Sequence, residues 1–337
     1  MNQDLILQVR NLKTYFPILR SFVAVLQRKP QEYIKAVDGV SFELASGEVL
    51  AIVGESGCGK TTIARTLIGL ETKTAGEVHF EGKPVRMVHG RTAKGNQVSL
   101  GQLRQKAQMV FQDPYESLNP RSSIGEIVGE PLLVHGITRN RTEQLARVRS
   151  VLEDVGLRPA DDYLLRYPHE LSGGQRQRVV IAAAMVLRPR LLIADEPVSM
   201  LDVSIRAEIL NLLNDLRRER GVSILFITHD LSTVAYFADR IAVMYLGRIV
   251  EMGSVHEVLS SPRHPYTQAL ISVVPVPNPR QRKEHTILQG ETPNPINLPS
   301  GCRFHPRCPV AFEKCKNFDP PEVEVGPSHF AACLLLK

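Results

Sequence analysis

The sequence predicts an α/β protein with a mostly parallel core sheet, an antiparallel sheet beside it, a helical insertion and a small C-terminal domain. Short apolar runs alternate with longer amphipathic stretches, as in parallel sheets whose strands are joined by helices. Residues 124–165 show helical spacing without intervening strands. Prolines become frequent after residue 262. We therefore expect a main body over residues 1–262, with its helical part at about 113–175, and a separate domain over 263–337.

Composition narrows the class of protein. The 337 residues are 43% hydrophobic and 23% charged, which is typical of a soluble globular chain. No apolar run reaches the roughly 18 residues that a bilayer-spanning helix needs, and the first residues lack the basic and then apolar pattern of a signal peptide. A net charge of +6 suits an anionic ligand, a membrane-proximal surface or a nucleic acid, and it decides among none of them.

The core elements follow from the periodicity of apolar residues. Core strands are predicted in short apolar runs, at residues 49–53, 191–194 and 223–227. Helices are predicted in amphipathic stretches, at residues 61–70, 175–187 and 205–220. Residues 5–12 and 36–44 alternate apolar and polar side chains, which indicates the antiparallel sheet.

A glycine-rich loop lies between the first core strand and its helix. Residues 54–61, GESGCGKT, match the pattern G-x4-G-K-S/T, in which backbone N–H groups surround a phosphate chain. Lys60 would contact the β- and γ-phosphates, and the Thr61 hydroxyl would bind Mg²⁺. Cys58 is interpreted as a small filler. The expected nucleotide contacts are Gly54, Glu55, Ser56, Gly57, Cys58, Gly59, Lys60, Thr61 and Thr62.

Two carboxylates end the second core strand. Residues 191–196 read LLIADE, so Asp195 and Glu196 come at the carboxyl edge of the sheet, where open α/β folds bind nucleotides. Asp195 would hold Mg²⁺ directly or through water. Glu196 would polarise an attacking water molecule.

A second anion-binding helix start is predicted at residues 171–175, LSGGQ. Ser172 is a favourable N-cap, and Gly173 and Gly174 leave the first helical N–H groups accessible before Gln175. The chain thus has two candidate phosphate cradles, but only one of them has a lysine. We infer that the second cradle completes the site of a partner.

Together these motifs resemble those of the ATP-binding-cassette (ABC) ATPases. The matching segments are the Walker A loop (54–61), the Q-loop (110–112, VFQ), the signature (171–175), Walker B (191–196), the D-loop (199–202, SMLD) and the switch-histidine motif (227–230, ITHD). They occur in the order typical of this family, and the resemblance extends over residues 5–260.

The resemblance implies a P-loop NTPase fold with a RecA-like parallel core, an antiparallel β-subdomain and a helical subdomain. It implies a dimer that encloses two ATP molecules, each between the Walker A loop of one subunit and the signature of the other. Glu196 would be the general base, His229 the γ-phosphate contact, and Gln112 the link from Mg²⁺ and the attacking water to a membrane partner. The remaining implied site residues are Asp202 in the D-loop and an aromatic residue against adenine, for which Tyr15 and Phe16 are candidates and spacing favours Phe16.

Two departures from the family pattern leave the catalytic groups in place. Met200 stands in the D-loop where alanine is commoner, and Ala183 follows the signature where many relatives carry arginine. Since Glu196 and His229 are both present, we expect ATP hydrolysis.

The tail narrows the kind of ABC protein. Residues 263–270, RHPYTQAL, and 301–309, GCRFHPRCP, resemble ATPase subunits of oligopeptide and dipeptide importers. This implies two transmembrane permease subunits, a second and different cassette chain, an extracytoplasmic substrate-binding protein, and a peripheral place at the cytoplasmic face of the membrane. Importers for nickel belong to the same group and remain an alternative. An ABC ATPase that serves nucleic acid or translation is disfavoured, because such proteins commonly carry two cassettes or a long coiled-coil insertion.

Four of the five cysteines lie near the C-terminus, at Cys302, Cys308, Cys315 and Cys333. Structural zinc sites usually contain C-x2-4-C pairs, which this spacing lacks, whereas four thiolates can hold a 4Fe–4S cluster. The matching tail of peptide-importer ATPases resembles a cluster-binding motif, which favours a cluster over zinc, disulfides or free thiols. His305 and His329 are possible substitute ligands, but surface histidines are the favoured interpretation of both. Because these cysteines lie outside every ATP motif, the tail is expected to be an appendage of the catalytic body.

Overall fold

The computed structural model describes residues 4–20, 26–27, 30–87, 97–273, 290–291 and 293–336. The chain divides into two compact units. The first comprises Met1–Leu7, Leu44–Val49 and Phe80–Ile227, and the second comprises Gln8–Glu43, Leu50–His79 and Thr228–Lys337. Within the described ranges, no helix has both the length and the apolar character that crossing a membrane requires.

Three parallel strands form the core of the first unit. They are β7 (Ala107–Val110), β8 (Leu191–Asp195) and β9 (Ser223–Thr228), in the order β7-β8-β9. All residues of β8 and β9 are buried, which confirms the strands predicted from their apolar runs. The register pairs Val110 with Ala194 and Asp195 with Ile227. The carboxyl ends of the three strands therefore lie at one edge.

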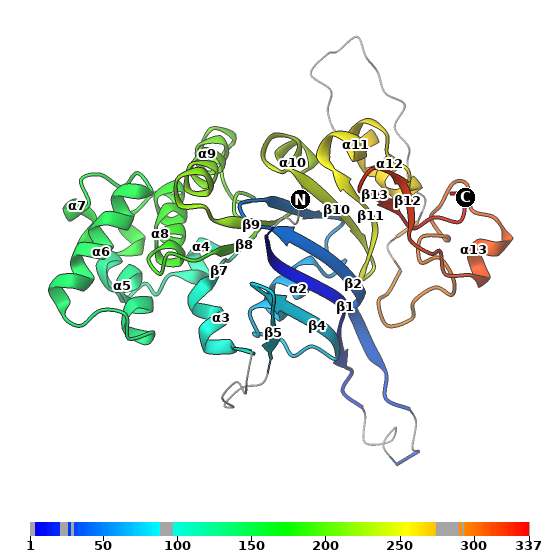
Figure 1. The fold of residues 1–337 in the computed structure, drawn as a ribbon, viewed down its shortest axis with the longest axis horizontal. Helices are drawn as coiled ribbons and strands as arrows, with labels where there is room; N and C mark the ends of the chain where they lie inside the picture. Colours follow the sequence, from blue (N-terminus) through cyan, green and yellow to red (C-terminus); the bar gives the residue numbers. More distant parts are fainter. Residues whose placement is uncertain are drawn as a thin grey trace, which may run out of the picture. The chain divides into compact units, whose positions relative to one another are not determined.

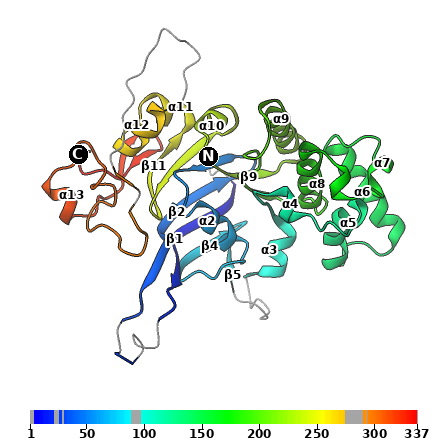
Figure 2. The same ribbon diagram turned by 180° about the vertical axis from the view of Figure 1, so that it is seen from behind.

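The helical insertion is confirmed. Its main helices are α5 (Ile124–Val134), α6 (Arg141–Asp154) and α7 (Asp161–Leu164). Helix α8 (Gly173–Met185), which was predicted separately at residues 175–187, lies together with them in both views (Figures 1 and 2). Ser123 begins α5 with a capping box, in which its side chain accepts from Glu126 N and the Glu126 side chain accepts from Ser123 N. Ile124, Val128 and Leu132 are fully buried, as the helical spacing predicts. Leu133 departs from this pattern, because 61% of it is exposed.

The other elements of the first unit are short, apart from one long helix. They are β5 (Lys83–Arg86), β6 (Val98–Ser99), α3 (Leu100–Lys106), α4 (Pro114–Ser117), the 3₁₀ helix η1 (Pro168–Glu170) and α9 (Val203–Arg220). Strands β5 and β6, which lie outside the segments predicted to form the antiparallel sheet, pair in parallel.

The second unit contains the strand that precedes the glycine-rich loop. Strand β3 (Val49–Val53) pairs in parallel with β10 (Arg240–Tyr245). Antiparallel strands continue from β10 in the order β11 (Arg248–Ser254), β13 (His329–Ala331) and β12 (Val323–Gly326). The other elements that lie wholly or mostly in this unit are β1 (Leu5–Pro17), β2 (Tyr33–Ala45), β4 (Ala75–Phe80), α2 (Lys60–Leu67), α10 (Leu231–Phe237), α11 (Val255–Ser260), α12 (Pro265–Ser272) and α13 (Glu313–Asn317). Strand β1 lies between β2 and β4.

The C-terminal region shares its sheet and its core with the main body. Strand β13 pairs with β11, with Glu251 opposite Ala331. The rings of Tyr245, Tyr266 and Phe304 are almost completely buried and pack with centroids 4.7–5.4 Å apart. The proposed boundary at residue 262 remains a prediction, but the residues after it are not isolated from the sheet.

A buried carboxylate organises the start of this region. Glu251 lies in the middle of β11, and its oxygens accept hydrogen bonds from the backbone N–H groups of Arg263, at 2.7 Å, and His264, at 2.8 Å. Nε2 of His329 lies 2.8 Å from the same carboxylate, and His329 is 3% exposed. The expectation that His329 is a surface residue is therefore wrong. It completes the hydrogen bonding of a buried acid, which would otherwise be costly to bury.

Candidate nucleotide-binding and hydrolysis site

The glycine-rich loop approaches its neighbours too closely for side chains at two of its glycines. A Cβ atom on Gly54 would lie 2.2 Å from the carbonyl oxygen of Met244, and one on Gly59 would lie 2.1 Å from that of Ala36. Gly59 also has a φ of 108° at the N-cap of α2, a conformation that favours glycine. The loop therefore presents bare backbone before a helix N-terminus, which is the geometry required to surround a phosphate chain.

The lysine of this loop is held inside it. Lys60 is 5% exposed, and its Nζ donates hydrogen bonds to the carbonyl oxygens of Gly54, at 2.8 Å, and Glu55, at 3.0 Å. Ser56, Gly57 and Thr61 are exposed on the accessible side of the loop, and Thr62 is half-buried. A buried ammonium beside accessible N–H and hydroxyl groups fits a polyphosphate with its Mg²⁺.

Cys58 faces inward. It is 2% exposed, its Sγ lies 3.8 Å from Lys60 Nζ, and burial raises the pKa of its thiol. A protonated, buried thiol is unreactive, which agrees with the interpretation of Cys58 as a filler.

The first unit brings three predicted hydrolysis residues to one sheet edge. Gln112 follows β7, Asp195 ends β8, and Glu196 follows it directly. Asp195 is 2% exposed, so its carboxylate is sheltered from bulk water. Gln112 Nε2 donates a hydrogen bond of 3.1 Å to Glu196 Oε2, which joins the Q-loop to the predicted general base.

The backbone holds Glu196 in an unusual conformation. Its φ is +47°, in the left-handed region that non-glycine residues seldom occupy. The Glu196 N–H donates to the carbonyl oxygen of Ile227 at 2.8 Å, and Ser199 Oγ donates to the Glu196 carbonyl at 3.0 Å. Such strain costs about 1–3 kcal/mol and is commonly found at functional sites.

His229 belongs to the second unit. It is exposed and comes two residues after Ile227, the residue that pairs with Asp195 in the sheet. Asp230, which follows it, caps α10 by accepting hydrogen bonds from the N–H groups of Ser232 and Thr233. The start of α10 thereby fixes the backbone next to His229.

The signature segment forms the predicted helix start. Ser172 is the N-cap of α8, and it and Gln175 form a reciprocal capping box with distances of 3.3 and 3.0 Å. A Cβ on Gly174 would lie 2.8 Å from Ile205 Cγ2, so this position has little space for a side chain. Ser172 itself is exposed, and Gly173 is half-buried. The N-terminus of α8 is therefore accessible to another molecule.

The D-loop residues lie beside this helix start. Asp202 is exposed and is the N-cap of α9, although its side chain makes no capping hydrogen bond. Met200, the departure from the family pattern, is 56% exposed and fills no core position.

The two aromatic candidates for adenine differ in their surroundings. The Tyr15 hydroxyl donates a hydrogen bond to Asp38, and burial followed by this hydrogen bond raises the pKa of Tyr15 to about 12. Neighbouring residues of a strand point to opposite faces, so Phe16 faces away from Asp38. Because Tyr15 is hydrogen-bonded to Asp38, Phe16 is the better candidate to stack on adenine, which is also the residue that spacing favours.

A backbone hydrogen bond joins two of the four C-terminal cysteines, Cys302 and Cys315. Burial raises the pKa of Cys302 to about 11, and electrostatic repulsion from the other three thiols adds to the shift. The Cys302 N–H donates to the Cys315 carbonyl at 2.9 Å, and all four residues carry free thiols. Across the residues that the structure describes, no three His, Cys, Asp or Glu side chains are arranged to hold a single metal ion.

Two contacts of the glycine-rich loop are not predicted by any local pattern in the sequence. The Glu55 N–H donates to the Tyr266 hydroxyl at 3.0 Å, and Arg307 binds both Glu55 carboxylate oxygens, at 2.8 and 3.1 Å. The partners are 211 and 252 residues away in sequence, so no local pattern indicates them. The only signal is that both lie in the segments RHPYTQAL and GCRFHPRCP. The expectation that the tail is an appendage is thus wrong, because the tail contacts the phosphate loop.

Replacing Lys60 with alanine is expected to weaken nucleotide binding by at least about tenfold, because a charge-assisted hydrogen bond is worth roughly 1.5–3 kcal/mol. The measurement is the binding of a fluorescent ATP analogue to the full-length chain. Lys83→Ala, which removes an exposed lysine of β5, is the matched control. Equal affinities of the Lys60→Ala and Lys83→Ala chains would contradict the assignment of Lys60.

Comparison with known proteins identifies the family of the chain. A family described as "ABC transporter" matches residues 37–199, and one described as "Oligopeptide/dipeptide transporter, C-terminal region" matches residues 250–315. The oligopeptide transport ATP-binding protein AppF of Bacillus subtilis is 49% identical over 336 residues, covering 99% of this chain and 98% of AppF. The dipeptide transport ATP-binding protein DppF of Haemophilus influenzae is 47% identical, covering 94% of this chain and 92% of DppF.

Solved structures show the same cassette fold. The structure of cbiO1 from Clostridium perfringens, part of an ABC transporter complex, superposes with a TM-score of 0.63 at 28% identity, covering 77% of this chain and 92% of cbiO1. A dimeric structure of the ATP-binding cassette MJ0796 with ADP and phosphate gives a TM-score of 0.60 at 26% identity, covering 74% of this chain and 98% of MJ0796. The chain therefore belongs to the family of ATP-binding subunits of oligopeptide and dipeptide ABC transporters.

Proposed function

We propose that this chain hydrolyses ATP to drive the import of dipeptides and oligopeptides through a membrane permease. The observation that carries the proposal is the hydrolysis edge, where Gln112 holds Glu196 beside the buried Asp195. The substrate class is supported by the peptide-transport relatives and by the match of residues 250–315 to their C-terminal region. Import of nickel or another small solute is the alternative, and a role outside transport is a more distant one.

Each residue of the site has a defined task in hydrolysis. The loop amides and Lys60 bind the β- and γ-phosphates, and Phe16 stacks on adenine. Thr61, Asp195 and Gln112 would supply oxygen ligands for Mg²⁺, which would neutralise phosphate charge when bound. Glu196 takes a proton from the attacking water, with its carboxylate oriented by Gln112. His229 donates a hydrogen bond to the γ-phosphate as charge develops on it.

Two chains would complete each site. The exposed cradle at Ser172 and Gly173 has the geometry to receive a γ-phosphate that is bound to the Lys60 loop of another cassette. Asp202, at the start of α9, would contact the partner beside it. The dimeric state of MJ0796 supports this arrangement. We infer that the second cassette is a different, homologous chain.

The helical insertion offers a docking groove for the permease. A groove of about 780 Å³ lies among α5, α6 and α7. It is lined in part by Leu133 and Leu165, which are 61% and 84% exposed. We infer that a cytoplasmic helix of a permease subunit occupies it, which places the chain at the cytoplasmic face of the membrane. Two permease subunits and an extracytoplasmic substrate-binding protein would complete the importer, and no nucleic acid is involved.

The general base is tested by Glu196→Gln in the transporter assembled in vesicles. ATP turnover and uptake of a labelled oligopeptide should both fall by more than tenfold, since a positioned base contributes about 10²–10⁴ in rate. Binding of a fluorescent ATP analogue should persist, because the amide keeps the shape of the side chain.

Glu219→Gln, an identical substitution at an exposed position of α9, serves as the control. Unchanged turnover in Glu196→Gln would refute the role of Glu196. Nickel uptake by wild-type vesicles without peptide uptake would support the alternative importer.

We further propose that Cys302, Cys308, Cys315 and Cys333 hold a 4Fe–4S cluster. Their mutual effect on the pKa of Cys302 supports a convergent set of thiols. The ligands of such a cluster each bind a different iron atom and so lie farther apart than the ligands of one ion. The lack of a single-ion site among the described residues is therefore compatible with a cluster. Bound there, the cluster would hold the chain segments around the four cysteines together.

Anaerobic purification should yield a brown protein with about four iron atoms and four sulfides per chain. Cys308→Ser should lose most of the iron, whereas Cys58→Ser should keep it, because Cys58 is a buried residue of the phosphate loop and is not one of the four tail cysteines. A colourless protein that contains zinc would rule the cluster out.

A further inference from the structure

The residue after the first glycine of the phosphate loop, Glu55, is held at two points by the C-terminal region. Its backbone N–H donates to the Tyr266 hydroxyl at 3.0 Å, and its carboxylate forms a two-fold ion pair with Arg307. Neither Tyr266 nor Arg307 is among the residues assigned to ATP binding or hydrolysis. They fix both the backbone and the charge of the loop at its first turn.

The segment around Tyr266 aims the hydroxyl at the loop. His264 Nδ1 accepts a hydrogen bond of 3.0 Å from the Tyr266 N–H, and Pro265 occupies the first turn of α12. The Tyr266 ring is completely buried and packs on Tyr245 and Phe304, at centroid distances of 4.7 and 5.4 Å. Because the ring cannot turn without opening this cluster, its hydroxyl has a fixed position.

Arg307 is fixed just as firmly. Its side chain is 9% exposed and its guanidinium lies 5.9 Å from the Tyr245 ring centroid. Consecutive turns hold the backbone between Cys302 and Cys308, including a hydrogen bond of 3.0 Å from Arg307 N to the Phe304 carbonyl. The planar fork of arginine matches both carboxylate oxygens of Glu55, which a lysine could not do.

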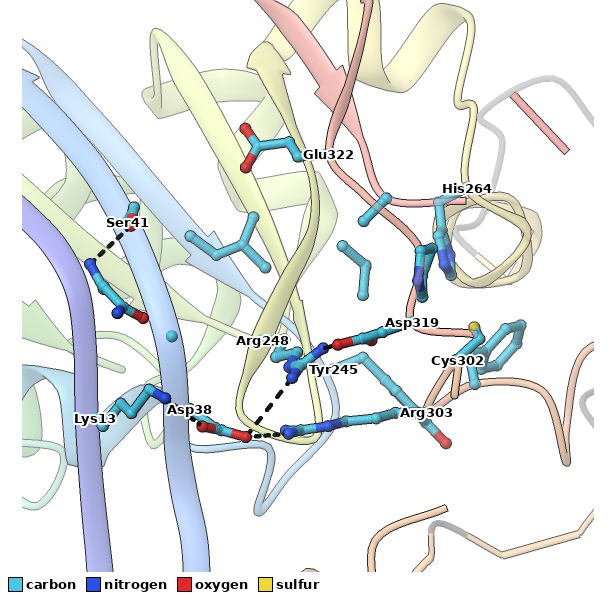
Figure 3. A pocket seen from close by; sticks show the side chains of 17 residues that line it. Lys13, Asp38, Ser41, Tyr245, Arg248, His264, Cys302, Arg303, Asp319 and Glu322 are labelled. Atoms are coloured by element: carbon cyan, nitrogen blue, oxygen red, sulfur yellow. Dashed lines mark hydrogen bonds and ion pairs between the residues drawn. The ribbon is translucent and has the colours of Figure 1, made fainter. Parts of the chain in front are cut away.

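A second ion-pair network, centred on Asp38, fixes Arg303 at the start of the turns between Cys302 and Cys308. Arg303 binds Asp38 and the Leu246 carbonyl, and Figure 3 shows Lys13 and Arg248 directed at the same carboxylate, both at 3.8 Å. Burial alone would raise the pKa of Asp38, but hydrogen bonds from Tyr15 and Arg303 outweigh it and hold the pKa below its usual value. Asp38 therefore stays ionised at neutral pH and keeps Arg303 in place.

The ion pair also has an electrostatic consequence at the phosphate loop. Glu55 is a carboxylate in a loop that receives a polyanion, and unpaired it would repel the phosphates. Arg307, whose side chain is 9% exposed, neutralises this charge through two parallel charge-assisted hydrogen bonds to the Glu55 carboxylate, which is 26% exposed. The loop can then keep an acidic residue without losing affinity for an anionic ligand.

We propose that Tyr266 and Arg307 are positioning residues of the phosphate loop, which hold Glu55 in place and so set the affinity of the chain for nucleotide. This inference rests on the proposed function, in that the loop binds ATP. It gives the C-terminal region a task within the ATP site, in addition to any task in transport.

The test is a double-mutant cycle on the full-length chain, with the Kd of a fluorescent ATP analogue as the readout. Arg307→Met should raise the Kd about tenfold, because it displaces the loop and leaves Glu55 unpaired. In a Glu55→Gln background, the same change should raise the Kd less than about twofold, because the charge to be neutralised is gone. Arg307→Lys should restore part of the affinity. In the assembled transporter, the KM for ATP should rise in Arg307→Met while kcat changes little.

Lys316→Met, which breaks an exposed ion pair with Glu313, is the control and should leave the Kd unchanged. If Arg307→Met fails to fold by circular dichroism, Tyr266→Phe decides, since it removes only the hydroxyl and should raise the Kd about threefold. Wild-type affinity in the folded variants, or an equal effect of Arg307→Met with and without Glu55→Gln, would overturn the proposal. Absence of ATP hydrolysis by the wild-type transporter would instead overturn the proposed function, and the Kd values would still decide the role of Arg307.

Discussion

The ion pair between Arg307 and Glu55 joins the cysteine-containing segment to the phosphate loop. This ion pair depends on other contacts. Tight turns position Arg307, and the ion pair of Arg303 with Asp38 holds those turns in place. The phosphate loop in turn has no side chains at Gly54 and Gly59 through which it could be packed in place. Polar anchors from elsewhere in the second unit therefore provide much of the rigidity that the loop itself lacks.

Buried charges, more than apolar area, specify the C-terminal region. Glu251 accepts hydrogen bonds from the residues that begin α12 and lies against His329, and Asp38 is bound by Arg303. Such pairs add little net stability, but each is costly to break once one partner is buried. They consequently allow a single arrangement, in which the Tyr266 hydroxyl and the Arg307 guanidinium both reach Glu55.

The sequence was sufficient for the elements that have strong local signals. Strong local signals occur in the apolar runs of β3, β8 and β9 and at the helix starts that are capped by Ser123 and Ser172. Strand β7 was missed because it has only four residues, and the short β12 and β13 lie among turns. The interpretation of the tail failed for another reason: its contacts to the loop join residues more than 200 positions apart, and pairing over that distance leaves no trace in periodicity.

Amide hydrogen exchange at Glu55 measures whether the C-terminal region holds the phosphate loop. In the wild-type chain this amide donates to the Tyr266 hydroxyl and should be protected. In Tyr266→Phe, which keeps the buried ring, the account predicts that the Glu55 amide exchanges at least about tenfold faster while amides in β3 are unaffected. Equal exchange at Glu55 in the two chains would contradict it.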